Sequence, residues 1–291
     1  HLEPRAAAWA RTWLAEVARK QGHFEDSLAL LAAAADEFAA VGDDHGAGQV
    51  WHFSGTLAAQ QGDLDAARER YERSLAIRES LGDSAGMAAL FSNLAIVAEY
   101  SGDYEHAEDL AEQGLALRRE LGDRWGIGIS QNNLGMLATL RGDPEGAKRR
   151  FEESMRLHAE VGDAWMVALG HNNLGNAARD LGEHDEARAS YSTALSAYRG
   201  YADLWVLAIL FEDVAILDAA LGRPESGWLL VGAADALHAR LGSPRTPDSA
   251  ARIHAALDEL RDQLPTTPED LRTRGAALSD AAVDRLVRAE P

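Results

Sequence analysis

Cysteine is absent from the sequence, which excludes disulfide bonds and thiolate chemistry and gives no sign of an oxidising compartment. No run of about 18 apolar residues occurs either, so we expect no membrane-spanning helix and a cytoplasmic location. The first residue is histidine, and no signal-peptide pattern follows it. We therefore expect a piece of a longer protein, whose functional output lies partly elsewhere.

Motifs that are typical of enzymes are missing as well. The sequence has no G-x-x-x-x-G-K-[ST] phosphate loop and no H-E-x-x-H zinc motif. Its ten histidines are scattered without the spacing of metal ligands. His45 and His52 could share a helix face, and we interpret them as surface residues without a role. We expect no catalytic activity, no cofactor and no metal site.

Basic residues are outnumbered, with 28 against 47 acidic residues and a formal net charge of −19. Nucleic-acid binders usually present a basic surface, so we expect no direct nucleic-acid binding by this segment. Lysine occurs only at Lys20 and Lys148. Arginine in its place, with abundant alanine and glycine, is typical of a high-GC bacterial genome.

What the sequence does contain is a glycine repeat with a period of 40 residues. A second set of glycines is offset from the first by 20 residues and is interrupted only at Ala202. Glycine readily adopts the left-handed conformation that ends a helix, so two stops per period indicate two helices per repeat. The first set is Gly22, Gly62, Gly102, Gly142, Gly182 and Gly222, and the second is Gly42, Gly82, Gly122, Gly162 and Gly242.

Aspartate follows many of these glycines. Asp accepts hydrogen bonds from free backbone N–H groups at a helix start, so each Gly-Asp pair closes one helix and opens the next. The predicted first helices of the six hairpins cover residues 5–21, 45–61, 85–101, 125–141, 165–181 and 205–221. The predicted second helices cover residues 24–41, 64–81, 104–121, 144–161, 184–201 and 224–241.

Side chains at equivalent repeat positions resemble the tetratricopeptide repeat. In repeat 51–81 the pattern is carried by Trp51, Ser54-Gly55, Gly62, Leu64, Ala67 and Tyr71. The chain departs from the family pattern in its period of 40 residues, where about 34 is usual. The resemblance implies an all-α, right-handed superhelical solenoid of about six hairpins over residues 1–241. Residues 242–291 are then expected to cap it, with helices near 248–263 and 268–288.

The stretch from Gly227 to Leu237 is similar to the end of large bacterial transcriptional regulators. In those proteins a terminal tetratricopeptide array senses an effector or partner and restrains an ATPase module. The resemblance implies that this segment is the sensor, with a protein, a peptide, another domain of the same protein or a small effector as its partner. A free-standing receptor for a peptide or small molecule, or a passive assembly scaffold, remains the alternative.

Asparagine recurs at one position of the predicted first helices. Asn is a poor helix former, so its repetition in mid-helix is unexpected from propensity alone. The resemblance implies that these positions face the concave groove, where amides could pair with an extended peptide. The alternative is that they tie neighbouring repeats together. The candidate binding residues are Asn93, Asn133, Asn173, Asn132, Asn172, Asn176, Asp213 and Arg179.

Tryptophan also recurs with the repeat, at Trp125, Trp165 and Trp205. Stacking against a ligand is one interpretation, but large aromatic side chains at repeat positions are usually part of the core between repeats. We therefore expect these three side chains to be buried.

Overall fold

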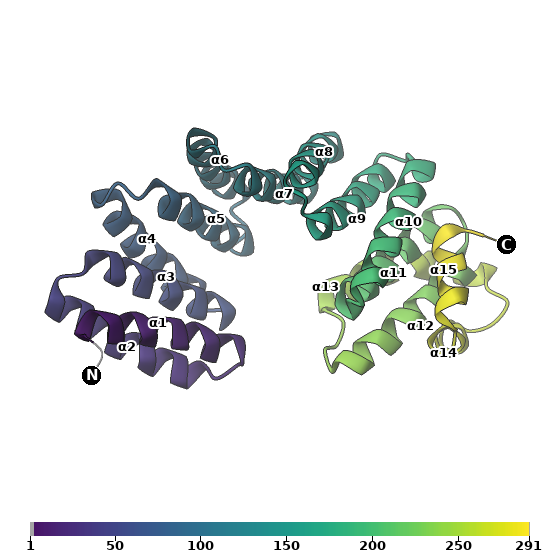
Figure 1. Ribbon diagram of the computed structural model, residues 1–291. Helices are drawn as coiled ribbons and strands as arrows, with labels where there is room; N and C mark the ends of the chain where they lie inside the picture. The colour runs from purple at the N-terminus through teal and green to yellow at the C-terminus, as the bar shows by residue number, and fades with distance from the viewer. Residues whose placement is uncertain (1–2, 291) are drawn as a thin grey trace. The chain divides into compact units, whose positions relative to one another are not determined.

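The computed structural model describes residues 3–290, and within that range it contains α-helices, one 3-10 helix and no strand (Figure 1). The predicted all-α class is confirmed, and the first twelve helices alternate as the first and second helices of the predicted repeats. The first helices are α1 (Pro4–Lys20), α3 (Asp44–Gln60), α5 (Ser84–Tyr100), α7 (Arg124–Leu140), α9 (Ala164–Asp180) and α11 (Leu204–Ala220). The second helices are α2 (Phe24–Val41), α4 (Leu64–Ser80), α6 (Tyr104–Leu121), α8 (Pro144–Val161), α10 (His184–Tyr201) and α12 (Pro224–Leu241).

The turns explain why the predicted helix limits agree with the observed ones to within about one residue. Gly42 ends α2 in the left-handed conformation, with φ of 66°. Ala202, where the glycine set is interrupted, keeps the same turn with φ of 53° despite its side chain. The geometry of the repeat is therefore retained where glycine is lost, at a conformational cost that glycine avoids.

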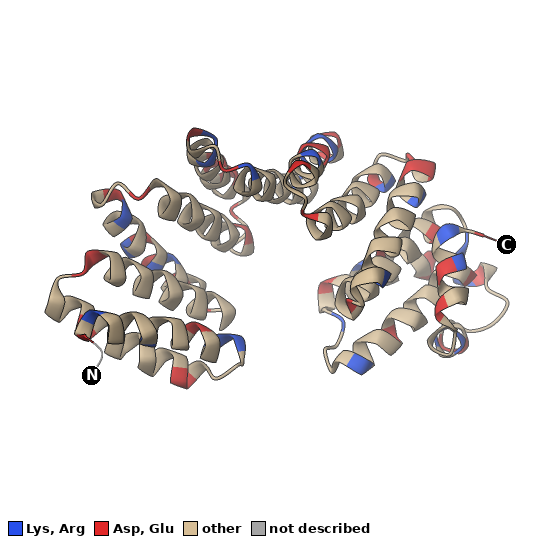
Figure 2. Cartoon of the chain, in the orientation of Figure 1, with Lys and Arg blue, Asp and Glu red and all other residues tan. Residues whose placement is uncertain are grey.

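Aspartate caps the start of five first helices, and Figure 2 shows acidic residues at these turns. The Oδ1 atom of Asp43 accepts a hydrogen bond from the backbone N–H of Gly46 at 3.0 Å. Asp83 and Asp163 accept equivalent bonds at 2.9 and 3.1 Å. Part of the negative charge of the chain therefore serves the local fold.

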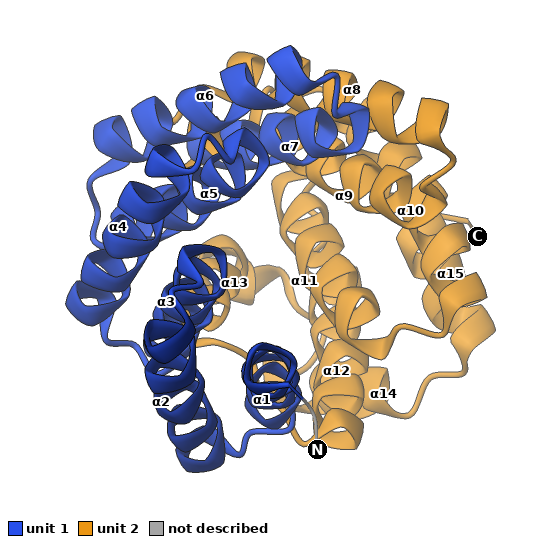
Figure 3. Cartoon of the chain, turned by 60° about the vertical axis from the view of Figure 1, so that its left-hand side comes forward, with its two compact units in different colours: residues 1–137 blue, residues 138–291 orange. Residues whose placement is uncertain are grey.

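The chain divides into two compact units, residues 1–137 and residues 138–291, which Figure 3 colours separately. In unit 1 (residues 1–137), each helix from α1 to α5 packs against the next one. The core of this unit includes Leu90, Leu94, Leu115 and Leu134. In unit 2 (residues 138–291), the helices from α8 to α12 pack in the same sequential way. Each unit is thus built by the contacts of neighbouring helices that define a solenoid.

Small residues let the paired helices approach closely. A Cβ atom at Gly55 would lie 2.6 Å from the ring of Tyr71, and one at Gly175 would lie 2.5 Å from the ring of Tyr191. These contacts join the small position of a first helix to the bulky position of the second helix in the same hairpin. At both places a glycine of the first helix thus makes room for the tyrosine ring of the second helix.

The C-terminal segment adds four shorter elements to unit 2: α13 (Pro247–Leu257), η1 (Asp258–Gln263), α14 (Pro268–Ala276) and α15 (Asp280–Arg288). Helix α13 packs on α11, α14 on α12, and α15 on both α10 and α12. The prediction of a single helix over 268–288 is wrong, because helix α14 ends at Ala276. Ser279 starts a new helix there by capping the N–H of Ala282.

Candidate binding site

The recurring asparagines occupy the same position on α5, α7 and α9. Asn93 and Asn133 belong to unit 1, and Asn173 belongs to unit 2. All three side chains are half-buried, whereas their neighbours Asn132 and Asn172 are buried. The first helices therefore present an amide at this position that is partly open to solvent.

Asn93 reaches back to the preceding repeat. Its Nδ2 atom lies 2.8 Å from Nε2 of His52 on α3. Burial, assisted by the positive charge of Arg78, lowers the pKa of His52 from 6.5 to about 4. At neutral pH the imidazole is neutral, so Asn93 donates and His52 accepts. The interpretation of His52 as a surface residue without a role is therefore wrong.

This pKa predicts a loss of stability in mild acid. The unfolded chain binds a proton at His52 near pH 6.5, but the native chain resists protonation down to about pH 4, so stability falls as the pH drops between these values. From pH 7 to pH 5 we expect His52 to account for a loss of about 2 kcal/mol. Urea denaturation of the whole chain at both pH values measures it. A His52→Gln variant should lose correspondingly less, and an identical pH dependence in both proteins would contradict the prediction.

Four of the predicted site residues form one network in unit 2. Oδ2 of Asp213 on α11 accepts hydrogen bonds from Nδ2 of Asn172 at 2.9 Å and from Nδ2 of Asn176 at 3.1 Å, both on α9. Arg179 donates to Oδ1 of Asn176 at 2.9 Å, and the hydroxyl of Tyr191 donates to the same oxygen at 2.8 Å. In this unit the geometry fits the alternative in which the polar residues tie neighbouring repeats together.

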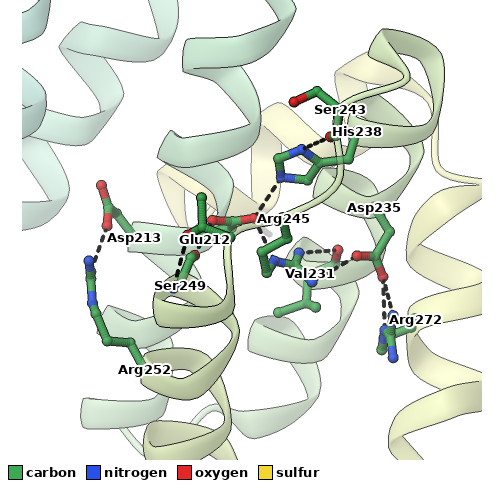
Figure 4. A network of polar contacts seen from close by, with 11 residues as sticks. Glu212, Asp213, Val231, Asp235, His238, Ser243, Arg245, Ser249, Arg252 and Arg272 are labelled. Atoms are coloured by element: carbon green, nitrogen blue, oxygen red, sulfur yellow. Dashed lines mark hydrogen bonds and ion pairs between the residues drawn. The ribbon is translucent and has the colours of Figure 1, made fainter. Parts of the chain in front are cut away.

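A second network was not anticipated from the sequence, and it surrounds the buried Glu212 on α11 (Figure 4). Glu212 accepts hydrogen bonds from His238 at 2.9 Å, from Arg245 at 2.6 Å and from Ser249. Arg245 also pairs with Asp235 at 2.8 Å. The network joins α11 and α12 to the segment that follows Gly242. The only signal for it in the sequence is an acidic pair in the middle of an apolar helix.

The tryptophan prediction is wrong for two of its three members. Trp125 is 51% exposed and Trp205 is 53% exposed, whereas Trp165 is partly buried against the core of unit 2. Each lies in the first turn of a first helix, where neighbouring helices cover the side chain only in part. Trp125 and Trp205 therefore have largely exposed side chains at their helix starts.

A pocket of about 160 Å³ lies between α5, α6 and α7 in unit 1. Its polar rim includes Asn133, the predicted site residue on α7, and the Glu99 side chain on α5. Burial raises the pKa of the Glu99 carboxyl. Its apolar wall includes Ile96 and Met136, which are 40% and 44% exposed. Asn133 is thus a predicted site residue that the structure places at a cavity in unit 1.

The described residues, 3–290, contain no group of three or more His, Asp or Glu side chains placed to hold a metal ion. Across the same residues, every helix is too short or too polar to cross a bilayer.

The comparison with protein families gives a specific match. The family model described as tetratricopeptide repeat matches residues 6–80, 47–120 and 86–160, and a second model of the same description matches residues 168–201. A search of the curated proteins gives no match.

Solved structures show the same fold at low sequence identity. BtubC from P. vanneervenii is 21% identical, with a TM-score of 0.63, over 69% of this chain and 83% of that one. A STAND signal-transduction ATPase with a tetratricopeptide repeat sensor, from Pyrococcus horikoshii, is 14% identical, with a TM-score of 0.63, over 97% of this chain and 44% of that one. A Rap protein in complex with competence and sporulation factor is 14% identical, with a TM-score of 0.63, over 93% of this chain and 78% of that one.

Proposed function

Because the chain belongs to the tetratricopeptide repeat family, we propose that it binds a protein or peptide partner through exposed side chains of its first helices. Repeats of this family imply protein binding, and the fold is in general an interaction scaffold without catalysis. In the finer form of the proposal, the segment senses a partner or effector for a multidomain bacterial transcriptional regulator in the cytoplasm. The partner is then another protein or another domain of the same full-length chain.

The observation that carries the proposal is the exposed surface of α5 and α7 in unit 1. Ile96 and Met136 are large apolar side chains that face solvent beside the polar Asn133, around the same pocket. An exposed apolar patch with a few convergent polar groups is the usual character of a binding surface. On α9 in unit 2 the same repeat position is polar, because Asn176 stands where α5 has Ile96 and α7 has Met136. Unit 1 is therefore the part of the chain that we expect to hold a partner.

Two of the similar structures support the sensor form of the proposal. The P. horikoshii protein is a signal-transduction ATPase in which the tetratricopeptide repeats are the sensor, and this chain spans 44% of it. The Rap protein was solved in complex with competence and sporulation factor. The first protein has a tetratricopeptide repeat sensor and the second is bound to a factor, and neither identifies the partner of this chain.

The experiment compares capture by the unchanged chain with capture by a triple variant, Asn93→Ala, Asn133→Ala and Asn173→Ala. Both are used as bait in lysate from the host, and bound proteins and metabolites are identified by mass spectrometry. We expect at least one protein or peptide to be retained by the unchanged chain and lost by the variant, because the variant removes three amides from first helices.

A matched control variant, Glu72→Ala, Gln113→Ala and Glu152→Ala, changes three exposed residues of second helices and should retain the same partner. Equal capture by the unchanged chain and the asparagine variant would contradict binding through the first helices. Loss of capture in the control variant alone would move the binding surface to the second helices. Capture of a small molecule without any protein would instead favour the receptor alternative.

A further inference from the structure

The pocket between α5, α6 and α7 combines an apolar wall with one acidic group. Its α5 side is formed by Ala95, Ile96 and Glu99, and its α7 side includes Met136 and Leu137. A cavity of about 150 Å³ is large enough for a benzene-sized group, so a pocket of about 160 Å³ accepts a single side chain. The ligand group that fits this pocket is therefore small and largely apolar.

The environment of Glu99 differs from that of the buried acidic residues of α11 and of the aspartate caps. The buried Glu212 and Asp213 each accept hydrogen bonds from several donors, and the aspartate caps accept backbone N–H groups. Within residues 3–290, the carboxylate of Glu99 has no hydrogen-bond or ion-pair partner, although it lines a pocket and is partly desolvated. A desolvated carboxylate without a partner is unfavourable, and an incoming cation would relieve that cost.

We propose that this pocket binds the side chain of a lysine or arginine in the partner peptide, with the aliphatic stem against Ile96 and Met136 and the cationic head at Glu99. The inference rests on the proposed function and names the chemistry that its partner must carry. Long basic side chains bury their methylene groups along apolar surface and keep the charge at a polar end. In the pocket, the apolar wall can contact the methylene groups and the carboxylate of Glu99 can contact the charged end.

Two neighbouring groups add to the match. Asn133 lines the same pocket from α7, and its amide oxygen is a second acceptor for the cation. Tyr100 also lines the pocket and is 73% exposed, so its ring lies at the open side, where a cation can approach an aromatic face. The net charge of −19 further favours the approach of a basic partner.

The test uses methyl NMR of the whole chain labelled at its methionines. The chain has four methionines, and Met136 is the one that lines the pocket, so the other three act as internal controls. The probe is lysine blocked as N-acetyl-lysine N-methylamide. The matched neutral probe is N-acetyl-norleucine N-methylamide, which has the same stem and no charge.

We expect the lysine probe to shift the Met136 methyl signal in a saturable way and to bind roughly tenfold tighter than the norleucine probe, as for a charge-assisted contact. Glu99→Gln keeps the shape and removes the charge, so it should reduce the affinity for lysine to that for norleucine. Glu79→Gln, on an exposed carboxylate of α4 outside the pocket, should change neither affinity.

Three results would overturn the inference: no shift of Met136, equal affinities for the two probes, or unchanged affinity in Glu99→Gln. Binding of n-butylammonium as tight as that of blocked lysine would assign the pocket to small amines instead of peptides. The two proposals fail in different ways. If Glu99→Gln still retains the captured protein, the proposed function stands, but the proposal that a basic side chain occupies the pocket is contradicted. If the lysine probe shifts Met136 but no protein is captured, the pocket's preference for a basic side chain stands and the proposed function is contradicted.

Discussion

Replacing Arg188 by methionine should lower the free energy of unfolding around α11 by about 3–5 kcal/mol, the usual cost of removing one partner from a buried ion pair. Asp218 on α11 is 1% exposed and pairs with Arg188 on α10. Without the guanidinium, the carboxylate would keep only the hydrogen bond from the Ser226 hydroxyl at 2.6 Å. A buried charge with one neutral donor is poorly compensated.

The same arginine holds the last helix of the chain. Its Nη1 atom donates to the carbonyl oxygen of Val287 on α15 at 3.1 Å. Cationic groups are favourable near helix C-terminal carbonyls, so the substitution should also loosen α15 from α10. Native-state hydrogen exchange of the whole chain measures both effects, with faster exchange expected in α10, α11 and α15 and little change in α1 to α5.

The double variant Arg188→Met, Asp218→Leu is the control. It removes both charges and leaves apolar groups of similar size, a change that is often nearly neutral in a buried site. We expect it to recover most of the lost protection in α10 and α11. If the double variant is as unstable as the single one, then packing and not charge explains the role of Arg188.

Replacing Gly232 by leucine should separate α14 from α12 at a cost of about 3 kcal/mol or more. A Cβ atom at Gly232 would lie 2.1 Å from the carbonyl oxygen of Arg272, and one at Gly275 would lie 2.0 Å from that of Leu229. The two helices therefore touch through their backbones, and no side-chain rotation can relieve the overlap. Helix propensity alone predicts the opposite sign, because glycine is less favourable than leucine inside a helix.

Limited proteolysis measures the separation, with new cleavage expected in the stretch between α13 and α14 and around residues 277–279. The control is Gly200→Leu on α10, where a Cβ atom would meet nothing within 4 Å. That variant should resist proteolysis at least as well as the unchanged chain. Equal resistance of Gly232→Leu would show that α12 and α14 can adjust, which would contradict the tight backbone contact.

The helices and their limits could be predicted from the sequence because their signals are local. A glycine and an aspartate side by side define both the end of one helix and the start of the next, as the bonds of Gly42 and Asp43 show. The break inside 268–288 has no such glycine-aspartate signal, and Ser279 is a weaker one. The tail was therefore predicted as helical but with one helix too few.

For the candidate site, the sequence predicted the repeat positions of the residues but not their contacts. The repeat placed Asn133 and Asn172 on the correct helices, but it could not show that Asn133 lines a pocket while Asn172 bonds to Asp213, which is 41 residues away. Partners at that separation depend on how the helices pack. The same limit explains the error at Trp125 and Trp205, whose recurrence gives a position but not the extent to which neighbours cover it.

The buried acids of α11 also bear on how the chain folds as it is synthesised. The hairpins of unit 1 consist of contacts between neighbouring helices, so each can form soon after its second helix leaves the ribosome. Helix α11 differs, because Glu212 and Asp213 pair with Arg245 and Arg252, which follow 33 and 39 residues later. Until those arginines emerge, Glu212 lacks its charged partner and Asp213 has only the amides of Asn172 and Asn176. Burial of α11 is therefore complete only after the C-terminal segment has been synthesised. The hairpins of unit 1 can fold earlier during synthesis than the C-terminal part of unit 2.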